Sequence, residues 1–159
     1  MSLENLNDKQ QEAVKQIEGP LLILAGAGSG KTSTMTHRIA YMVDQGISPY
    51  NILAVTFTNK AASEMRGRVE ELIGDCSNMW IMTFHAMCLR MLRIFPEQIG
   101  YQPNFVIYDT SDQKTLVRNI LKEKGISDRE FKPQYILAVI SKSKEKEMDA
   151  EGFRAAEED

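Results

Sequence analysis

A glycine-rich segment that ends in lysine and threonine is the part of the chain best suited to chemistry. Residues 25–32 read Ala-Gly-Ala-Gly-Ser-Gly-Lys-Thr. Glycines let a backbone curl so that successive N–H groups face inward and hold a polyanion. In such a loop a lysine reaches the terminal phosphates of a nucleoside triphosphate, and a threonine hydroxyl binds Mg²⁺. We therefore predict a triphosphate site with catalytic roles for Lys31 and Thr32, formed by Ala25, Gly26, Ala27, Gly28, Ser29, Gly30, Lys31 and Thr32.

Ala25 departs from the general pattern of such loops, G-x-x-x-x-G-K-[ST], which has glycine at this position. Alanine requires a negative φ there, which the end of a strand provides. A glycine-rich turn that binds nothing would explain the glycines but not Lys31 and Thr32. Because a lysine at a helix start is best satisfied by an anion, the sequence favours the phosphate-binding interpretation.

Gln10 lies upstream of the loop and has two possible roles. Its amide can offer a donor and an acceptor to the edge of adenine. Asn7 lies three residues before it, and this spacing is also that of a capping box at a helix N-terminus. The residues alone leave the two roles about equally open, and one amide cannot fill both at once.

Polar residues and an aromatic residue follow the predicted strand that ends at Phe57. The backbone N–H groups of a helix start, with Thr58, Asn59 and Lys60, can hold the phosphates of a nucleic acid, and Phe57 can stack on a base. In the alternative interpretation Phe57 packs in the core and Thr58 caps the helix. For the aromatic residue taken alone the core is favoured, because phenylalanines at strand ends usually pack.

His85 follows a third predicted strand, at the sheet edge where ligands of open α/β sheets gather. It can contact a phosphate or a base, or it can cap the helix that begins there. His37 does not lie at metal-ligand spacing from it, so we predict no metalloenzyme.

Alternating strand and helix patterns indicate how these residues are positioned. Three β-rich runs, 21–24, 52–57 and 79–83, recur at intervals of roughly thirty residues, and each precedes a run with helical periodicity. This order predicts βαβ units and a parallel sheet in a three-layer α/β core. The third helix should carry an apolar stripe of Phe84, Met87, Cys88, Met91, Leu92 and Phe95.

The remainder of the chain has a different character. A possible short strand at 105–108 leads to Thr110 and Gln113, whose capping-box spacing predicts a helix start. Gly125 should end that helix, and Pro133 can occupy the first turn of another. We therefore predict an α/β domain over 1–104 and an all-helical part over 105–159.

Composition bounds the class of protein. With 159 residues and 43% hydrophobic content, the chain suits one domain or slightly more. Residues 145–159 hold seven acids against two bases, which gives −5 and leaves +2 for residues 1–144 of the total −3. This balance permits nucleic-acid contact without requiring it. Cys76 and Cys88 indicate no disulfide framework, and no run suits a leader or membrane span. We therefore expect buried or inert thiols in a cytosolic protein.

In order, the motifs closely resemble the UvrD, PcrA and Rep type of superfamily 1 DNA helicases. The resemblance rests on Leu6-Asn7-x-x-Gln10, the loop 25–32, the run 55–62 and Thr83-Phe84-His85, with the segment 107–113 also similar. It covers essentially the whole chain, and it accounts for Ala25, because this family commonly begins its loop with Ala-Gly-Ala-Gly. It implies a RecA-like P-loop motor domain over 1–104 and the start of an inserted all-helical subdomain over 105–159.

The resemblance implies a role for each matching residue. Gln10 reads adenine, Lys31 and Thr32 serve ATP and Mg²⁺, and a DNA strand is contacted by Phe57, Thr58, Asn59, Lys60 and His85. Two features depart from the family. Ser33 stands where an arginine often packs on adenine, and no Asp-Glu motif follows a hydrophobic strand. The arginines expected from a second motor domain of the same polypeptide are also missing.

From this resemblance we predict that the chain is the N-terminal part of an ATP-dependent 3′ to 5′ DNA helicase that acts on single-stranded and partially duplex DNA. By itself the chain should show at most weak nucleotide binding and no appreciable ATPase. The alternatives are a non-catalytic nucleotide- or DNA-binding module that functions at this length and a small P-loop kinase. The Thr-Phe-Thr-Asn-Lys run gives the kinase no support.

Overall fold

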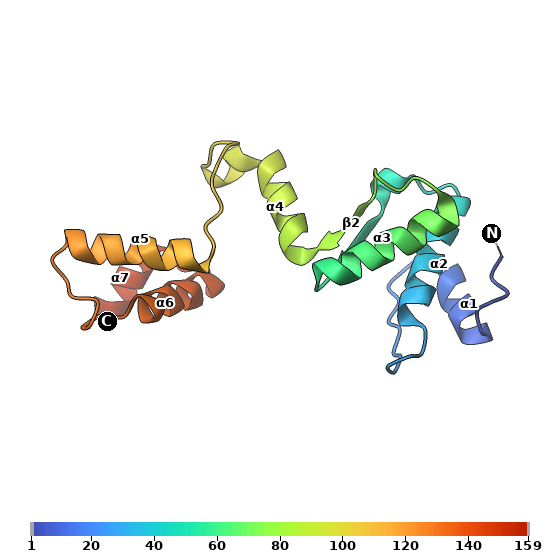
Figure 1. Ribbon diagram of the computed structural model, residues 1–159, viewed down its shortest axis with the longest axis horizontal. Coiled ribbons are helices and arrows are strands. Elements are labelled where there is room, and N and C mark those ends of the chain that lie inside the picture. The colour runs from blue at the N-terminus through green and yellow to red at the C-terminus, as the bar shows by residue number, and fades with distance from the viewer. Residues whose placement is uncertain (1, 159) are drawn as a thin grey trace. The chain divides into compact units, whose positions relative to one another are not determined.

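A computed structural model describes residues 2–158 of the chain (Figure 1). The chain divides into two compact units, of which the first extends to Pro103 and the second begins at Asn104. No helix among the described residues is long and apolar enough to cross a lipid bilayer. Each unit has its own secondary structure and is described by itself.

The first unit is α/β. Its elements in chain order are α1 (Asp8–Lys15), α2 (Lys31–Asp44), the 3₁₀ turn η1 (Pro49–Asn51), β1 (Leu53–Thr56), α3 (Asn59–Ile73), β2 (Trp80–Thr83), α4 (Phe84–Ile94) and the 3₁₀ turn η2 (Pro96–Ile99). β1 and β2 pair in parallel, with Thr56 opposite Thr83, and α3 forms the connection between them. Two of the predicted strands are thus confirmed as a parallel pair, with shorter bounds.

The core of this unit lies where α2 and α3 pack on the strand pair. Alternate strand residues point to the buried face, so Ala54 and Ile81 pack against helix residues such as Ile39 and Val69. Ile81 and Val69 are fully buried. Burial of each such side chain contributes about 1.5–3 kcal/mol, so this cluster holds α2 and α3 in place. The buried members are Ile39, Ile52, Ala54, Val69, Cys76, Met79 and Ile81.

Two predicted strands are wrong. Leu21–Leu24 forms no strand, and Leu22 and Leu24 are 80% and 86% exposed. The predicted strand over residues 105–108 is likewise absent, with Val106 exposed. The physical reason is that a strand needs a neighbour for its backbone groups, and the sheet of the described residues contains β1 and β2 alone. The predicted core of three layers is therefore reduced to a two-stranded sheet with helices.

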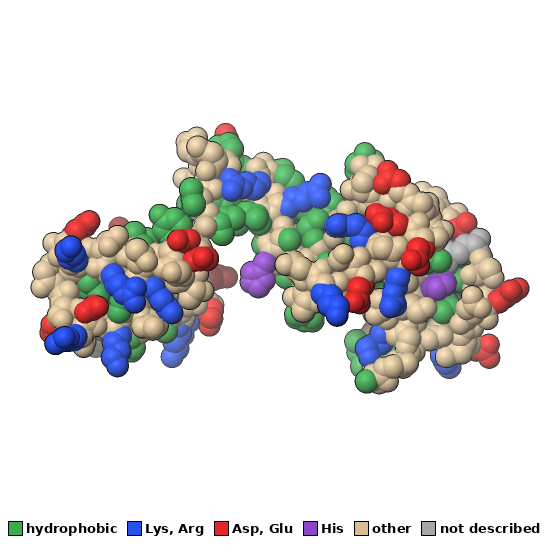
Figure 2. Space-filling model, in the orientation of Figure 1, with side chains coloured by type: hydrophobic (Ala, Val, Ile, Leu, Met, Phe, Trp, Pro, Cys, Tyr) green, Lys and Arg blue, Asp and Glu red, His purple; other side chains and the backbone are tan. Residues whose placement is uncertain are grey.

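The apolar stripe predicted for 84–95 lies on a real helix, but no residue of α4 is buried. Figure 2 shows hydrophobic side chains exposed over this helix. The expectation of buried thiols is confirmed for Cys76, which is buried, and is wrong for Cys88, which is exposed. Burial raises the pKa of the Cys76 thiol, with a further contribution from the nearby Glu70 carboxylate.

The second unit is all-helical over its described residues. It contains α5 (Thr110–Glu123), α6 (Pro133–Glu145) and α7 (Ala150–Glu158). Pro133 occupies the first turn of α6 as predicted. The predicted capping box is wrong, because α5 uses Asp109 as its N-cap and Asp112 as the reciprocal partner. α6 and α7 border an apolar groove of about 760 Å³.

Candidate nucleotide site and nucleic-acid interface

The glycine loop leads directly into α2, as the sequence predicts. Gly28 and Gly30 have φ of 72° and 82°, which an L side chain rarely adopts. Gly30 is the N-cap of α2, and a Cβ there would lie 2.7 Å from Gln10 Nε2. No side chain of the described chain caps this helix, so its N-terminal N–H groups and dipole are directed at the loop and available to an anion.

Within the loop, side chains bond to backbone carbonyls. Lys31 Nζ donates to the carbonyl oxygens of Ala25 and Gly26, at 3.1 and 2.5 Å. Ser29 Oγ also donates to Gly26 O, at 2.7 Å. The carbonyl oxygens thus take the place that phosphate oxygens would have beside the ammonium group. A bound polyphosphate must therefore exchange with these bonds.

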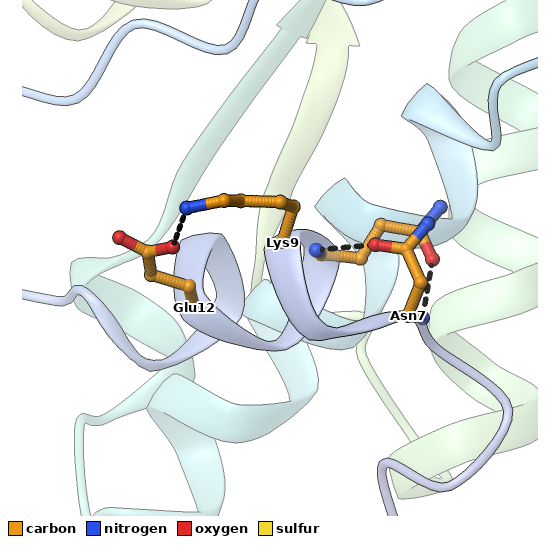
Figure 3. Close-up of polar contacts among 4 residues, drawn as sticks. Asn7, Lys9 and Glu12 are labelled. Carbon is orange, nitrogen blue, oxygen red and sulfur yellow. Dashed lines mark hydrogen bonds and ion pairs between the residues drawn. The ribbon is translucent and has the colours of Figure 1, made fainter.

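Gln10 joins the first helix to the loop. Asn7 N donates to Gln10 Oε1 at 2.9 Å and Gln10 N donates to Asn7 Oδ1 at 3.0 Å, the two bonds of a capping box (Figure 3). The other end of the same amide, Nε2, donates to Ser29 O at 3.0 Å. The capping role is confirmed, and the adenine role stays a prediction that requires one of these bonds to exchange.

Arg38 fixes the helix that carries Gln10. Its Nη1 donates to Ala13 O, in the last turn of α1, at 2.6 Å. Val14 is fully buried beside this contact. Sequence reasoning missed Arg38, since nothing in its helical pattern separates it from a solvated arginine. On the exposed side of α1, Lys9 and Glu12 form a 2.7 Å ion pair that raises the pKa of Lys9 and lowers that of Glu12 (Figure 3).

One protein hydroxyl of this loop, that of Thr32, is placed where it could hold Mg²⁺. Thr32 lies in the first turn of α2 and is half-buried. Residues 2–158 contain no group of three or more His, Cys, Asp or Glu side chains arranged to hold a metal. Mg²⁺ bound by a threonine would take its remaining ligands from phosphates and water, as it does in nucleotide sites. Ser33 stands where the helicase family often has an arginine, and its Oγ lies 3.4 Å from His37 Nδ1.

The ends of the two strands form a second site. Because Thr56 and Thr83 are opposite each other, the residues that follow them, Phe57 and Phe84, emerge side by side. Their ring centroids are 5.7 Å apart and the rings are tilted by 49°. Sequence reasoning missed Phe84 as a partner of Phe57. The repeated Thr-Phe pair at the end of both predicted strands is the signal that could have found it.

Both helices that start at this edge are capped by threonine. Thr58 Oγ1 accepts a bond from Ala61 N at 3.1 Å, and Thr83 Oγ1 accepts one from Ala86 N at 3.2 Å. The capping role of Thr58 is confirmed, whereas the cap of α4 is Thr83 and not His85. The two N-terminal turns therefore open toward the same edge of the sheet.

The predicted nucleic-acid residues are all exposed at this edge. Phe57 is 91% exposed, so the core location favoured for it from the aromatic side chain alone is wrong. Asn59 and Lys60 occupy the first turn of α3, and His85 the first turn of α4. Lys60 lies 4.0 Å from Glu64 across an exposed pair, which leaves its charge largely available to a phosphate.

Two arginines contact β2, one of the two strands that end at this edge. Arg66 Nη2, from α3, donates to Ile81 O at 2.6 Å. Arg90, from α4, lies over the Trp80 ring at 4.4 Å from its centroid. These contacts tie α3 and α4 to β2 and thereby help to fix the position of its end.

The first unit is an α/β fold with two distinctive features. One is a glycine loop at a helix N-terminus, and the other is a pair of exposed aromatic residues at the ends of parallel strands. Together these features make the chain a candidate nucleotide- and nucleic-acid-binding protein. The sequence profile of the UvrD/REP helicase N-terminal domain matches residues 6–159, and the chain belongs to this family. It is 51% identical over 144 residues to the ATP-dependent DNA helicase PcrA of Staphylococcus epidermidis, a match that covers 89% of this chain and 20% of that protein.

The ATP-dependent DNA helicase PcrA of Staphylococcus aureus gives the same identity, 51% over 144 residues, with the same shares of the two chains, 89% and 20%. The chain therefore spans about a fifth of the length of these curated relatives. The match includes the glycine loop and the strand-end edge, because both lie within residues 6–159.

Proposed function

We propose that this chain is the ATP-binding part of an ATP-dependent DNA helicase that moves 3′ to 5′ along single-stranded DNA. Residues 1–104 would form part of the first RecA-like motor domain, and residues 105–159 the beginning of an inserted helical subdomain. The observation that carries the proposal is the glycine loop at the start of α2 in a chain that matches the helicase family over residues 6–159. The relatives named PcrA are ATP-dependent DNA helicases and support the same activity.

The proposed nucleotide is ATP with Mg²⁺. Lys31 exchanges the carbonyls of Ala25 and Gly26 for the β and γ phosphates, and the N–H groups at the start of α2 hold the same oxygens. Thr32 ligates the metal, which neutralises phosphate charge when bound. Gln10 turns its amide from Ser29 O to the edge of adenine. The strand-end residues take no part in these contacts and remain available to a second ligand.

The proposed second ligand is single-stranded DNA, or the single-stranded part of a partial duplex. Phe57 offers an exposed ring on which a base stacks. Thr58, Asn59 and Lys60 at the start of α3 and His85 at the start of α4 bind the backbone phosphates or base edges. This division of contacts gives affinity without a strong sequence preference.

Hydrolysis needs groups that residues 1–159 do not supply. In-line attack by water on the γ phosphate requires an acid to help hold Mg²⁺, a glutamate to activate water and arginines to stabilise transition-state charge. No Asp-Glu motif follows a hydrophobic strand in this sequence. We therefore propose that these groups come from the rest of the polypeptide, including a second motor domain, and that the chain alone has no appreciable ATPase.

Lys31→Ala in the full-length protein tests the loop assignment. The variant should lose DNA-stimulated ATP hydrolysis and keep most of its DNA affinity, because the lysine serves the phosphates. Lys15→Ala, which removes an exposed lysine of α1, is the matched control and should leave both unchanged. Unchanged hydrolysis in the Lys31 variant would refute the assignment, and DNA-stimulated hydrolysis by the purified 159-residue chain would refute its inactivity.

A further inference from the structure

We infer that Phe84 is a positioning residue for nucleic-acid binding: its ring holds the ring of Phe57 in the orientation in which a base stacks on it. This inference rests on the proposed binding of single-stranded DNA at the strand ends. It adds a residue outside the set Phe57, Thr58, Asn59, Lys60 and His85. It also states a mechanism, because Phe84 acts through Phe57 and not on the strand directly.

The first argument is the exposure of Phe57. Its side chain is 91% exposed, so almost nothing restrains the ring by burial. A side chain in this situation samples several rotamers and loses that freedom when a base binds. The ring centroid of Phe84 lies 5.7 Å away with a 49° tilt, inside the range of favourable aromatic pairs. This contact limits the rotamers of Phe57 before binding and so reduces the conformational entropy that the side chain loses when a base binds.

The second argument is the geometry of the pair. A base held between two rings needs them parallel and about 7 Å apart, twice the base spacing along a strand. The tilt of 49° and the separation of 5.7 Å leave no such space. A base can therefore stack on Phe57 only outside the space between the two rings, so Phe84 acts by restraining the Phe57 ring and does not form the other side of a base sandwich.

The third argument is the difference between the two backbones. Phe84 is the first residue of α4, directly after Thr83, which is buried and pairs with Thr56 in the sheet. Phe57 lies in the two-residue connection between β1 and α3, outside both elements. The fixed residue orients the one that is less restrained, so the direction of the effect is from Phe84 to Phe57.

The test measures the affinity of the full-length protein, as parent and variants, for fluorescein-labelled oligo(dT) by anisotropy at fixed, low salt. Phe57→Ala should weaken binding by about 5- to 150-fold, the range for loss of one stacked base. Phe84→Ala should weaken it by about 2- to 12-fold, the range for loss of one aromatic pair. The double variant should bind no more weakly than Phe57→Ala, because Phe84 has no effect without its partner.

Three further measurements separate positioning from general structural damage. Phe84→Tyr keeps the ring and should restore the affinity of the parent chain. An abasic strand of equal length keeps the phosphates, so Phe84→Ala and the parent should bind it equally. Phe95→Ala removes an exposed aromatic residue at the other end of α4 and should change neither affinity.

The outcomes distinguish this inference from the function on which it rests. Additive losses in the double variant would show that Phe84 binds DNA on its own and would overturn the positioning role. An unchanged affinity in Phe84→Ala, or an equal loss on the abasic strand, would overturn it as well. Failure of the parent chain to bind oligo(dT) would overturn both the inference and the proposed DNA site, whereas an effect of Phe57→Ala alone would leave the DNA site intact.

Discussion

The glycine loop and the strand-end edge are built in different ways. The loop takes its shape from neighbouring residues: two glycines at positive φ and bonds from Ser29 and Lys31 to carbonyls a few residues away. The edge depends on the register of two strands that are 27 positions apart, since Thr56 pairs with Thr83. A local motif is complete within a short stretch of sequence, whereas the geometry of a site made by strand pairing also requires the partner strand and its register.

The largest expected effect comes from breaking the sheet that builds the edge. Ile81 is fully buried in the core that β1, β2, α2 and α3 share, so Ile81→Ala should lower the free energy of unfolding by about 2–5 kcal/mol. Urea denaturation followed by circular dichroism measures this loss. A change below 1 kcal/mol would contradict the packing described here.

The next largest effect should come from a substitution in the glycine loop that leaves the strand-end edge unchanged. Gly30→Ala places a Cβ at φ 82° and 2.7 Å from Gln10 Nε2, so the left-handed strain of about 1–2 kcal/mol should appear as lost stability and weaker nucleotide binding. Gly67→Ala is the matched control. Gly67 lies inside α3 with no atom within 4 Å of an added Cβ, so alanine there should stabilise by about 0.5–1 kcal/mol.

Thermal unfolding and titration with a fluorescent ATP analogue follow both glycine variants, and oligo(dT) affinity should stay at the parent level in each. Equal behaviour of the two variants would mean that the conformation of Gly30 has no special role. A loss of DNA affinity in Gly30→Ala would show that the loop and the edge are not independent.

The smallest expected effect concerns a turn outside both sites, and it serves as a reference for the other variants. Asp75 accepts bonds from the backbone N–H and the hydroxyl of Ser77, and these bonds lower the pKa of its carboxyl. A lowered folded-state pKa stabilises the fold above the unfolded value, and that contribution disappears as the pH falls through the folded-state pKa. The Ser77→Ala variant removes the hydroxyl bond and keeps the backbone bond, so it should lose a little stability at pH 7, and the loss should shrink as the pH falls through the folded-state pKa. Urea denaturation at neutral and at acidic pH measures the difference.

The sequence predicts the local features well. The loop at the start of α2 and the parallel pairing of two strands follow from residue type and spacing. The caps at Asn7 and Thr58 are each one of two alternatives that the residues leave open, and the structure has both caps. The strand predicted at Leu21–Leu24 is absent. An apolar run indicates only that a segment can be buried, and burial in a sheet also requires a partner.

The residues that sequence reasoning missed act through tertiary contacts. Arg38 reaches a carbonyl 25 positions away, and Arg66 reaches one 15 positions away. Both look like solvated helix residues when the helices are considered alone. The aromatic residue taken alone favours the core for Phe57, whereas the family resemblance favours an exposed position, because a strand-end phenylalanine packs or not according to what covers the strand end.

The exposed run Leu21–Leu24 has a consequence for the behaviour of the chain in solution. An apolar segment without a pairing partner offers free backbone groups and uncovered side chains to any other extended chain. Preparations of the 159-residue chain should therefore self-associate as the protein concentration rises. A polar substitution such as Leu22→Gln would improve solubility without touching the loop that follows it.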